Sequence, residues 1–389
     1  MKLALLKGNR FNPWHLQGFS MLPDSVEVTA FRAESEIQHY FAERDDAEPK
    51  FRVKRIYFDT QAGNPVRRAA NAISQRFTGR APRVLPFFEC LEGFDLIQSW
   101  EMFTDWTAQA LEARARWGIP LAVMVWDNIP FNMERNPERR ALKARTAEEA
   151  DCFIVYTERS RRMLRLEGVP KAKIRRINPG VDIERFSPGP AERAALGLDD
   201  DELVILFVGW LLPRKGIDYL LLALRELLND PELSGKRVRL LVVGSGPGRE
   251  RVEGLIERLA LGKICTFAGS LPYSRMPGAY RAADVFVLPS IATPEWQEQF
   301  GMSLIEAMAS GVPVISTLSG AIPEIAGYAA VLCQPNDFIS LYEALKTMLL
   351  HPDRREQLGA AGRKRAASEY DLRTHVEQLT QVYKELTQG

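Results

Sequence analysis

The feature that most constrains the fold is a regular alternation between short apolar runs and longer segments with helical periodicity. The short runs are rich in Val, Ile, Leu and Phe, which is typical of parallel strands buried between helices. The pattern therefore indicates an α/β fold. We predict strands over 2–8, 25–31, 51–58, 94–100, 120–126, 152–157 and 173–178 in the first half, and over 203–210, 238–246, 264–270, 285–290, 313–317 and 330–335 in the second.

The alternation occurs twice, on either side of a segment near 185–202 that is rich in proline, glycine and acidic residues and that we interpret as a linker. A chain of 389 residues is long enough for two packed domains. We therefore predict two doubly wound, Rossmann-like domains facing each other across a cleft, with ligand-binding loops at the carboxyl ends of their strands. The expected domains are 1–185 and 186–370, followed by a helical segment at 371–389.

The charge balance argues against a surface built for a polyanion such as nucleic acid, because 51 basic residues nearly cancel 50 acidic ones. The beginning of the sequence has too short an apolar run for a signal peptide, and no later run reaches the roughly 20 residues of a membrane span. We expect a cytoplasmic protein. The cysteines lack the spacing of a zinc site or a disulfide framework and are expected to be reduced core residues: Cys90, Cys152, Cys265 and Cys333.

Two basic residues, Arg214 and Lys215, follow the predicted strand 203–210 and stand just before or in the first turn of a helix. Cations are unfavourable at a helix N-terminus, where the dipole is already positive. An anionic ligand would remove this conflict, and a diphosphate suits an arginine fork, a lysine and free amides. The alternative is a solvated pair of surface charges.

The second strand of this half runs into a glycine-rich turn that contains Gly244, Gly246 and Gly248. Glycines permit the close approach of a backbone to a phosphate. The spacing is not that of the dinucleotide-binding motif, so a tight structural turn remains an equal alternative.

The most informative stretch is 283–325, in which Glu298 precedes a predicted helix and Glu306 lies about one and a half turns inside it. Glu298 could be a simple N-terminal cap. Glu306 stands among apolar residues, and a buried glutamate needs a partner. A hydroxyl-rich ligand such as ribose could be that partner.

Taken together, these features resemble the retaining glycosyltransferases of the GT-B fold, the large family with a Glu-x7-Glu motif (group 1 glycosyltransferases). The resemblance covers about 178–335. It rests on FVGWLLPRKG, VVGSGP, FAGSLP, ADVFVLPS, SGAIPEI and EQFGMSLIEAMASGVPVI, which contains the Glu298 and Glu306 pair.

The resemblance implies donor-binding roles for the matching positions. Arg214 and Lys215 would bind the donor diphosphate, Glu298 the transferred sugar and Glu306 the ribose. Of these, Arg214, Lys215 and Glu298 are the expected catalytic residues, and Glu298 would act through positioning and electrostatics rather than as a nucleophile. The expected donor site also contains Gly209, Gly244, Gly246, Gln299, Phe300 and Gly301, with Gly320 and Glu324 in a nearby loop.

The first half departs from the family pattern. Many relatives carry two glycines after the first strand, where this chain has only Gly18, and a histidine after the fifth strand, where this chain has Trp126, Asp127 and Asn128. Asp127 or Asn128 could replace the histidine, or His15 could reach the site from the first loop. His15 could equally be an ordinary loop residue.

Segment 64–86 contains several arginines and no acidic residue, with an apolar side between them. It could contact an anionic membrane or acceptor, or simply be a solvated basic helix. The arginines are Arg67, Arg68, Arg76, Arg80 and Arg83.

The function expected from the resemblance is retaining transfer of a sugar from a nucleotide-sugar donor to a glycan, lipid-linked or small-molecule acceptor. A UDP-sugar is favoured and GDP-mannose is next. No cofactor is expected, and no metal, since the sequence has no Asp-x-Asp motif. The alternatives are an epimerase or phosphorylase of the same fold, or a non-catalytic binding or scaffold protein.

Overall fold

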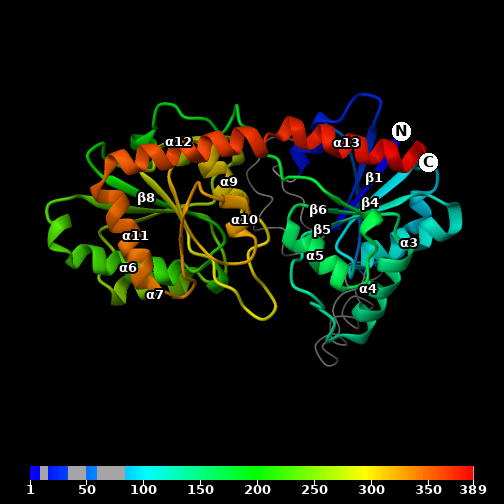
Figure 1. Cartoon of the computed structure of the whole chain (residues 1–389), viewed down its shortest axis with the longest axis horizontal. Coiled ribbons are helices and arrows are strands. Elements are labelled where there is room, and N and C mark those ends of the chain that lie inside the picture. The colour runs from blue at the N-terminus through cyan, green and yellow to red at the C-terminus, as the bar shows by residue number, and fades with distance from the viewer. Residues whose placement is uncertain (9–15, 34–49, 59–83, 389) are drawn as a thin grey trace, which may run out of the picture. The chain divides into compact units, whose positions relative to one another are not determined.

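The computed structural model describes residues 1–8, 16–33, 50–58 and 84–388. The chain divides into two units (Figure 1). The first consists of Met1–Ile177 and Val376–Gly389, and the second of Asn178–His375.

The first unit is built on a seven-stranded sheet with the order β3-β2-β1-β4-β5-β6-β7, in which all paired strands are parallel. Its central strands are buried on both faces, as their apolar runs predict. The strands are β1 (Lys2–Gly8), β2 (Glu27–Ala33), β3 (Arg52–Ile56), β4 (Leu96–Trp100), β5 (Leu121–Val125), β6 (Cys152–Val155) and β7 (Ile174–Arg176).

The principal helices of this unit follow strands and begin at side-chain caps. The N-caps are Thr104, Asn136 and Thr157, whose side-chain oxygens accept from amides of the first turn. The elements outside the sheet are α3 (Asp105–Trp117), α4 (Pro137–Glu149), α5 (Glu158–Leu166) and the short helices η1 (Gln17–Met21), η3 (Phe88–Leu91) and η4 (Lys171–Lys173).

The second unit has a six-stranded parallel sheet with the order β10-β9-β8-β11-β12-β13. The strand order reverses between β8 and β11, so the loops after these two strands lie at the point of the carboxyl edge where doubly wound sheets bind ligands. The strands are β8 (Leu203–Val208), β9 (Val238–Val243), β10 (Cys265–Gly269), β11 (Val285–Leu288), β12 (Val314–Thr317) and β13 (Val331–Cys333).

Helices cover this second sheet, and α6 packs along α11 while α9 packs along α12 (Figure 1). One core joins Ile205 and Phe207 of β8 to Leu220 of α6 and Leu345 of α11. The helices are α6 (Ile217–Asn229), α7 (Arg249–Arg258), α8 (Met276–Arg281), α9 (Met302–Ala309), α10 (Ile322–Ala326), α11 (Phe338–Leu350) and α12 (Pro352–Glu369), with η5 (Arg193–Leu196), η6 (Pro213–Lys215), η7 (Pro231–Leu233) and η8 (Tyr273–Arg275).

The last helix, α13 (Leu372–Gln388), begins in the second unit and belongs to the first from Val376 onward. Within the first unit, the Tyr383 hydroxyl donates to the side-chain oxygen of Gln98 on β4. The segment near 185–202, predicted as a linker, lies within the second unit. Phe186 is fully buried there, and its ring centroid is 5.8 Å from that of Tyr280.

All the predicted strands are confirmed, and the α/β fold class with them.

The prediction for the cysteines is correct in part. Cys152 and Cys333 are buried, and burial raises the pKa of their thiols to about 12 and about 11. Cys265, on the edge strand β10, is half-buried. For Cys90 the prediction is wrong: the residue is exposed, because it lies on the short surface helix η3 rather than on a strand.

Candidate active site

The loop after β8 places Arg214 and Lys215 on η6, just before α6, as predicted. The next residue, Gly216, has a φ of +71°, and a Cβ there would lie 1.8 Å from the carbonyl oxygen of Pro289. The Ile291 amide donates to the Arg214 carbonyl at 2.9 Å. The loop after β8 is therefore fixed against the loop after β11.

The side chain of Glu298 lies in the loop after β11 and meets Lys215. The Lys215 ammonium lies 2.8 Å from the Glu298 carboxylate, and the Ser290 hydroxyl donates to the same oxygen at 2.7 Å. Only 5% of Glu298 is exposed. The alternative that Glu298 caps a helix is wrong, because the N-cap of α9 is Gly301 and no side chain caps that helix.

A third loop, after β12, fixes the backbone of Glu298. The Ala321 amide donates to the Glu298 carbonyl at 2.9 Å. Gly320 has a φ of +57°, and a Cβ there would lie 2.0 Å from that carbonyl oxygen. The structure thus brings Gly320 against Glu298. Glu324 lies on the following helix α10, where it is half-buried.

The aromatic ring of Trp296 covers both cations. Its centroid lies 4.7 Å from the Arg214 guanidinium carbon and 5.1 Å from the Lys215 nitrogen. Sequence reasoning missed Trp296. The available signal was a tryptophan two residues before a predicted site glutamate.

Glu306 lies on α9 and is buried, with 5% exposed. The Tyr280 hydroxyl donates to its carboxylate at 2.7 Å, and Tyr273 is a second hydrogen-bond partner. Burial raises the pKa of Glu306 to about 7, although both tyrosines oppose this shift. The sequence prediction that Glu306 needs a partner is met within the protein, by tyrosine hydroxyls.

The glycines in the loop after β9 allow that loop to pack closely against the loop after β8. Gly244 has a φ of +132°, and a Cβ there would lie 2.0 Å from the carbonyl oxygen of Gly209. Gly246 has a φ of +153° and would bring a Cβ to 2.9 Å from the amide nitrogen of Leu211. Gly248 donates its amide to the Leu211 carbonyl at 2.9 Å. The structural-turn alternative accounts for all three glycines.

The remaining predicted donor residues precede or begin α9. Gln299 is half-buried, Phe300 is buried, and Gly301 has a φ of +71°. The helix that starts at Met302 therefore has its amide end beside the Glu298 loop.

In the first unit, Asp127 and Asn128 follow β5 and are buried. The Asp127 carboxylate accepts from the amides of Asn128 at 2.8 Å and Ile129 at 3.2 Å, and from the Asn132 side chain at 3.2 Å. Burial raises its pKa, against these hydrogen bonds. Asp127 thus organises its own loop. Gly18 lies on η1 and is buried.

At the carboxyl end of β1 lies a buried cation that the sequence did not single out. The Lys7 nitrogen lies 4.8 Å from the ring centroid of Trp100 and 4.6 Å from that of Trp126. Trp100 is the last residue of β4 and Trp126 follows β5, so the three side chains meet at one edge of the sheet.

His15 and the arginines Arg67, Arg68, Arg76, Arg80 and Arg83 lie outside the described residues.

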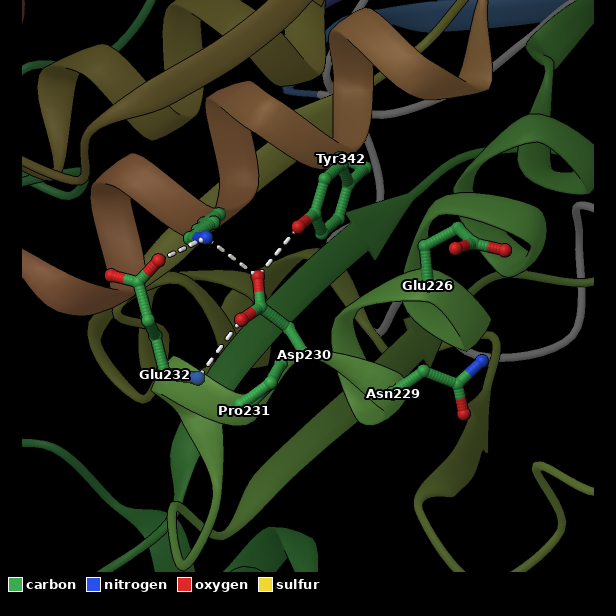
Figure 2. Close-up of a pocket in the computed structure, with 7 residues that line it drawn as sticks. Glu226, Asn229, Asp230, Pro231, Glu232 and Tyr342 are labelled. Carbon is green, nitrogen blue, oxygen red and sulfur yellow. Dashed lines mark hydrogen bonds and ion pairs between the residues drawn. The ribbon is translucent and has the colours of Figure 1, made fainter.

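A pocket of about 340 Å³ lies at the C-terminal end of α6 (Figure 2). Asp230 accepts there from the Tyr342 hydroxyl at 2.5 Å and lies 2.8 Å from the Lys346 ammonium. These contacts lower the pKa of Asp230 to about 2. Because α6 runs antiparallel to the strands, its C-terminal end lies at the amino edge of the sheet, away from Lys215 and Glu298.

Among the residues that the structure describes, no group of three or more His, Cys, Asp or Glu side chains is arranged to hold a metal ion. No helix in the same part of the chain is both long enough and apolar enough to span a membrane.

Solved structures resemble the chain over its whole length. The sucrose-phosphate synthase of Thermosynechococcus elongatus aligns with a TM-score of 0.76 at 24% identity, over 99% of both chains. Anabaena HepE, solved with UDP and glucose, aligns with a TM-score of 0.77 at 18% identity, over 99% of this chain and 100% of its own. These likenesses show the GT-B fold.

The family model described as "Glycosyl transferases group 1" matches residues 189–365, and the model "Glycosyltransferase Family 4" matches 32–185. A D-inositol 3-phosphate glycosyltransferase of Corynebacterium jeikeium is 31% identical over 70% of this chain and 68% of its own length. The enzyme of the same name from Gordonia bronchialis is 31% identical over 64% of this chain, but only 58% of its own length is matched. The chain belongs to the group 1 glycosyltransferases.

Proposed function

We propose that the chain transfers a sugar from a nucleoside-diphosphate sugar to an acceptor hydroxyl, with retention of anomeric configuration. The observation that carries the proposal is the junction of Lys215 and Glu298 at 2.8 Å, with Arg214 beside them at the carboxyl edge of the second sheet. A cation pair suits a diphosphate, and an adjacent carboxylate suits the hydroxyls of a sugar.

In this reaction the bond between the sugar C1 and the diphosphate oxygen breaks, and the acceptor oxygen bonds to C1 on the same face. The acceptor proton ends on the departing phosphate. Arg214 and Lys215 stabilise the negative charge that grows on the leaving group. Glu298 stabilises the positive charge that develops on the sugar ring. No metal enters this proposal.

The favoured donor is a UDP-sugar, with GDP-mannose next. Support comes from the similar structures of Anabaena HepE, which were solved in complex with UDP and with UDP-glucose. Glu306 would bind the ribose once its carboxylate turns from the tyrosine hydroxyls to the ligand. The acceptor is a glycan, a lipid-linked sugar or a small molecule. On the first unit, Asp127 or Asn128 is the proposed contact with the donor sugar or the acceptor.

The first test is the melting temperature with UDP, GDP and ADP. A ligand at 100 times its Kd adds about 2.7 kcal/mol, which corresponds to several degrees for a domain of this size. We expect one nucleotide to stabilise the wild type but not Lys215→Ala. The matched control is Lys236→Ala, an exposed lysine in the loop before β9. If none of the three nucleotides raises the melting temperature of the wild type, a non-catalytic scaffold protein becomes the favoured interpretation.

The second test follows the products. NMR of the transferred sugar should show the donor's anomeric configuration, and activity should persist in EDTA. Conversion of the nucleotide-sugar without an acceptor would instead indicate an epimerase.

We also propose that segment 64–86 contacts anionic membranes, on the strength of its arginines alone. Cosedimentation with vesicles of phosphatidylserine and phosphatidylcholine at low salt tests this, and absence of binding would exclude it.

A further inference from the structure

The Trp296 ring lies against two adjacent cations whose roles the proposed function already assigns. The distances are 4.7 Å to the Arg214 guanidinium and 5.1 Å to the Lys215 ammonium, both within cation–π range. Two like charges on consecutive residues repel each other, and each long side chain has many rotamers. An aromatic ring that attracts both cations offsets the repulsion and restricts these rotamers.

The position of the ring is fixed by its own loop. The Thr293 amide donates to the Trp296 carbonyl at 2.6 Å, and the Trp296 amide donates to the Thr293 carbonyl at 3.3 Å. The Thr293 hydroxyl also donates to the Trp296 carbonyl, at 3.2 Å. These bonds close a four-residue turn that presents the indole toward η6.

The cations are fixed by the same pair of loops. The Arg214 carbonyl accepts from the Ile291 amide at 2.9 Å, and Lys215 is tied to Glu298. The loop after β11 therefore holds the backbone of Arg214, the ammonium of Lys215 and the face of Trp296 together. All these residues belong to the second unit.

We infer that Trp296 is a positioning residue for the donor: its indole ring holds the side chains of both Arg214 and Lys215 in place for the diphosphate. This inference rests on the proposed function. Trp296 acts through the two cations, so that the diphosphate binds groups that are already ordered.

The experiment measures the Kd of UDP by isothermal titration calorimetry for the wild-type chain and two variants. If the wild type binds GDP or ADP instead of UDP, that nucleotide is used for all three proteins. Trp296→Leu removes the aromatic face, and Trp296→Phe keeps one. We expect the Kd to rise about fivefold to thirtyfold in Trp296→Leu, in line with a cation–π contact that is partly desolvated. In Trp296→Phe the Kd should stay within about threefold of wild type.

A double-mutant cycle with Arg214→Ala tests whether Trp296 affects nucleotide binding through the two cations or by contacting the nucleotide directly. If Trp296 acts through the cations, Trp296→Leu should raise the Kd by a smaller factor in the Arg214→Ala background than in the otherwise unchanged chain, because only Lys215 is then left on the ring. An undiminished effect there would mean that the ring contacts the nucleotide itself, and would overturn the inference.

Two further outcomes separate the inference from the proposed function. If the wild type binds a nucleotide and Trp296→Leu binds it equally well, only the inference fails. If the wild type binds none of UDP, GDP and ADP, both fail. Circular dichroism of each variant without ligand checks that its fold is intact, and Trp296→Phe serves as the second variant if Trp296→Leu does not fold.

Discussion

Lys215 and Glu298, which stand 83 residues apart in the chain, meet at 2.8 Å where the loops after β8 and β11 converge. The carboxylate is buried, while the lysine side chain is 19% exposed. The ion pair with Glu298 stabilises the site when no ligand is bound. When a diphosphate binds, the Lys215 ammonium must interact with both the phosphate and Glu298. The pair therefore links the stability of the second unit to its binding of ligand.

Removing one member of this pair should destabilise the protein. Lys215→Ala leaves the buried Glu298 carboxylate without its ammonium partner, while the Ser290 hydroxyl still donates to it, at a cost of about 1–3 kcal/mol. The double variant Lys215→Ala/Glu298→Gln should recover part of this loss, because no buried charge is left. Urea denaturation checks both. Equal stability of Lys215→Ala and the wild type would contradict the expectation.

The raised pKa of Glu306 should make stability fall with rising pH. The native state holds the proton to about pH 7, whereas the ordinary pKa of the group is 4.5. Stability is therefore lost between these two values, since the native state binds more protons there than the unfolded state. The loss is on the order of 3 kcal/mol at about 1.4 kcal/mol per pKa unit. Urea denaturation at about pH 5 and about pH 8 should show it in the wild type and not in Glu306→Gln.

A matched variant, Tyr280→Phe, tests the cause of this pH dependence. The Tyr280 hydroxyl lowers the pKa of Glu306, so its removal should raise that pKa further. The fall in stability should then extend to higher pH than in the wild type. A fall that ends at lower pH would show that Tyr280 acts in the opposite sense.

Gly320 should tolerate no side chain, whereas Gly197 should tolerate one at modest cost. Both have positive φ values, +57° and +70°. A Cβ at Gly320 would lie 2.0 Å from the Glu298 carbonyl oxygen, and a Cβ at Gly197 would meet no atom within 4 Å. Gly197→Ala should cost about 1–2 kcal/mol from backbone strain alone. Gly320→Ala should cost more and weaken nucleotide binding, as melting and titration experiments would show; equal effects would refute the steric explanation.

Lys143 should be essential to the loop after β5. Its ammonium, on α4, lies 2.6 Å from the Glu167 carboxylate and 3.1 Å from the Asn132 carbonyl, and Glu167 also accepts from the Phe131 amide at 2.6 Å. Both charged side chains are buried, so Lys143→Met should cost about 3–5 kcal/mol. Lys143→Met/Glu167→Gln should be more stable than Lys143→Met in chemical denaturation. The reverse order would contradict a buried ion pair.

The fold was predictable from the sequence because buried parallel strands read as continuous apolar runs, and each predicted run contains a strand. The positions of Arg214, Lys215 and Glu298 at loop ends followed from the same pattern. Their pairing did not, because side-chain contacts across 83 residues depend on how three loops pack.

The contacts of Trp296 and Glu306 depend on loop conformations that the pattern of apolar and polar residues in the sequence does not specify. The stacking of Trp296 on Arg214 requires the turn closed by Thr293, and the tyrosine partners of Glu306 come from η8 and α8. Cys90 was misplaced because its apolar neighbours Phe87 and Leu91 are buried, whereas Cys90 lies on the exposed side of the same short helix η3.

The division of α13 between the units has a consequence for the order of folding during synthesis. The second unit is one continuous stretch, Asn178–His375, whereas the first is closed by Val376–Gly389. Gln98 is made early, but its partner Tyr383 leaves the ribosome only after the entire second unit has been translated. Domains generally fold as units while the chain emerges. Here the unit that is begun first is completed last, and a fragment ending at Ile177 would lack a part of its own core.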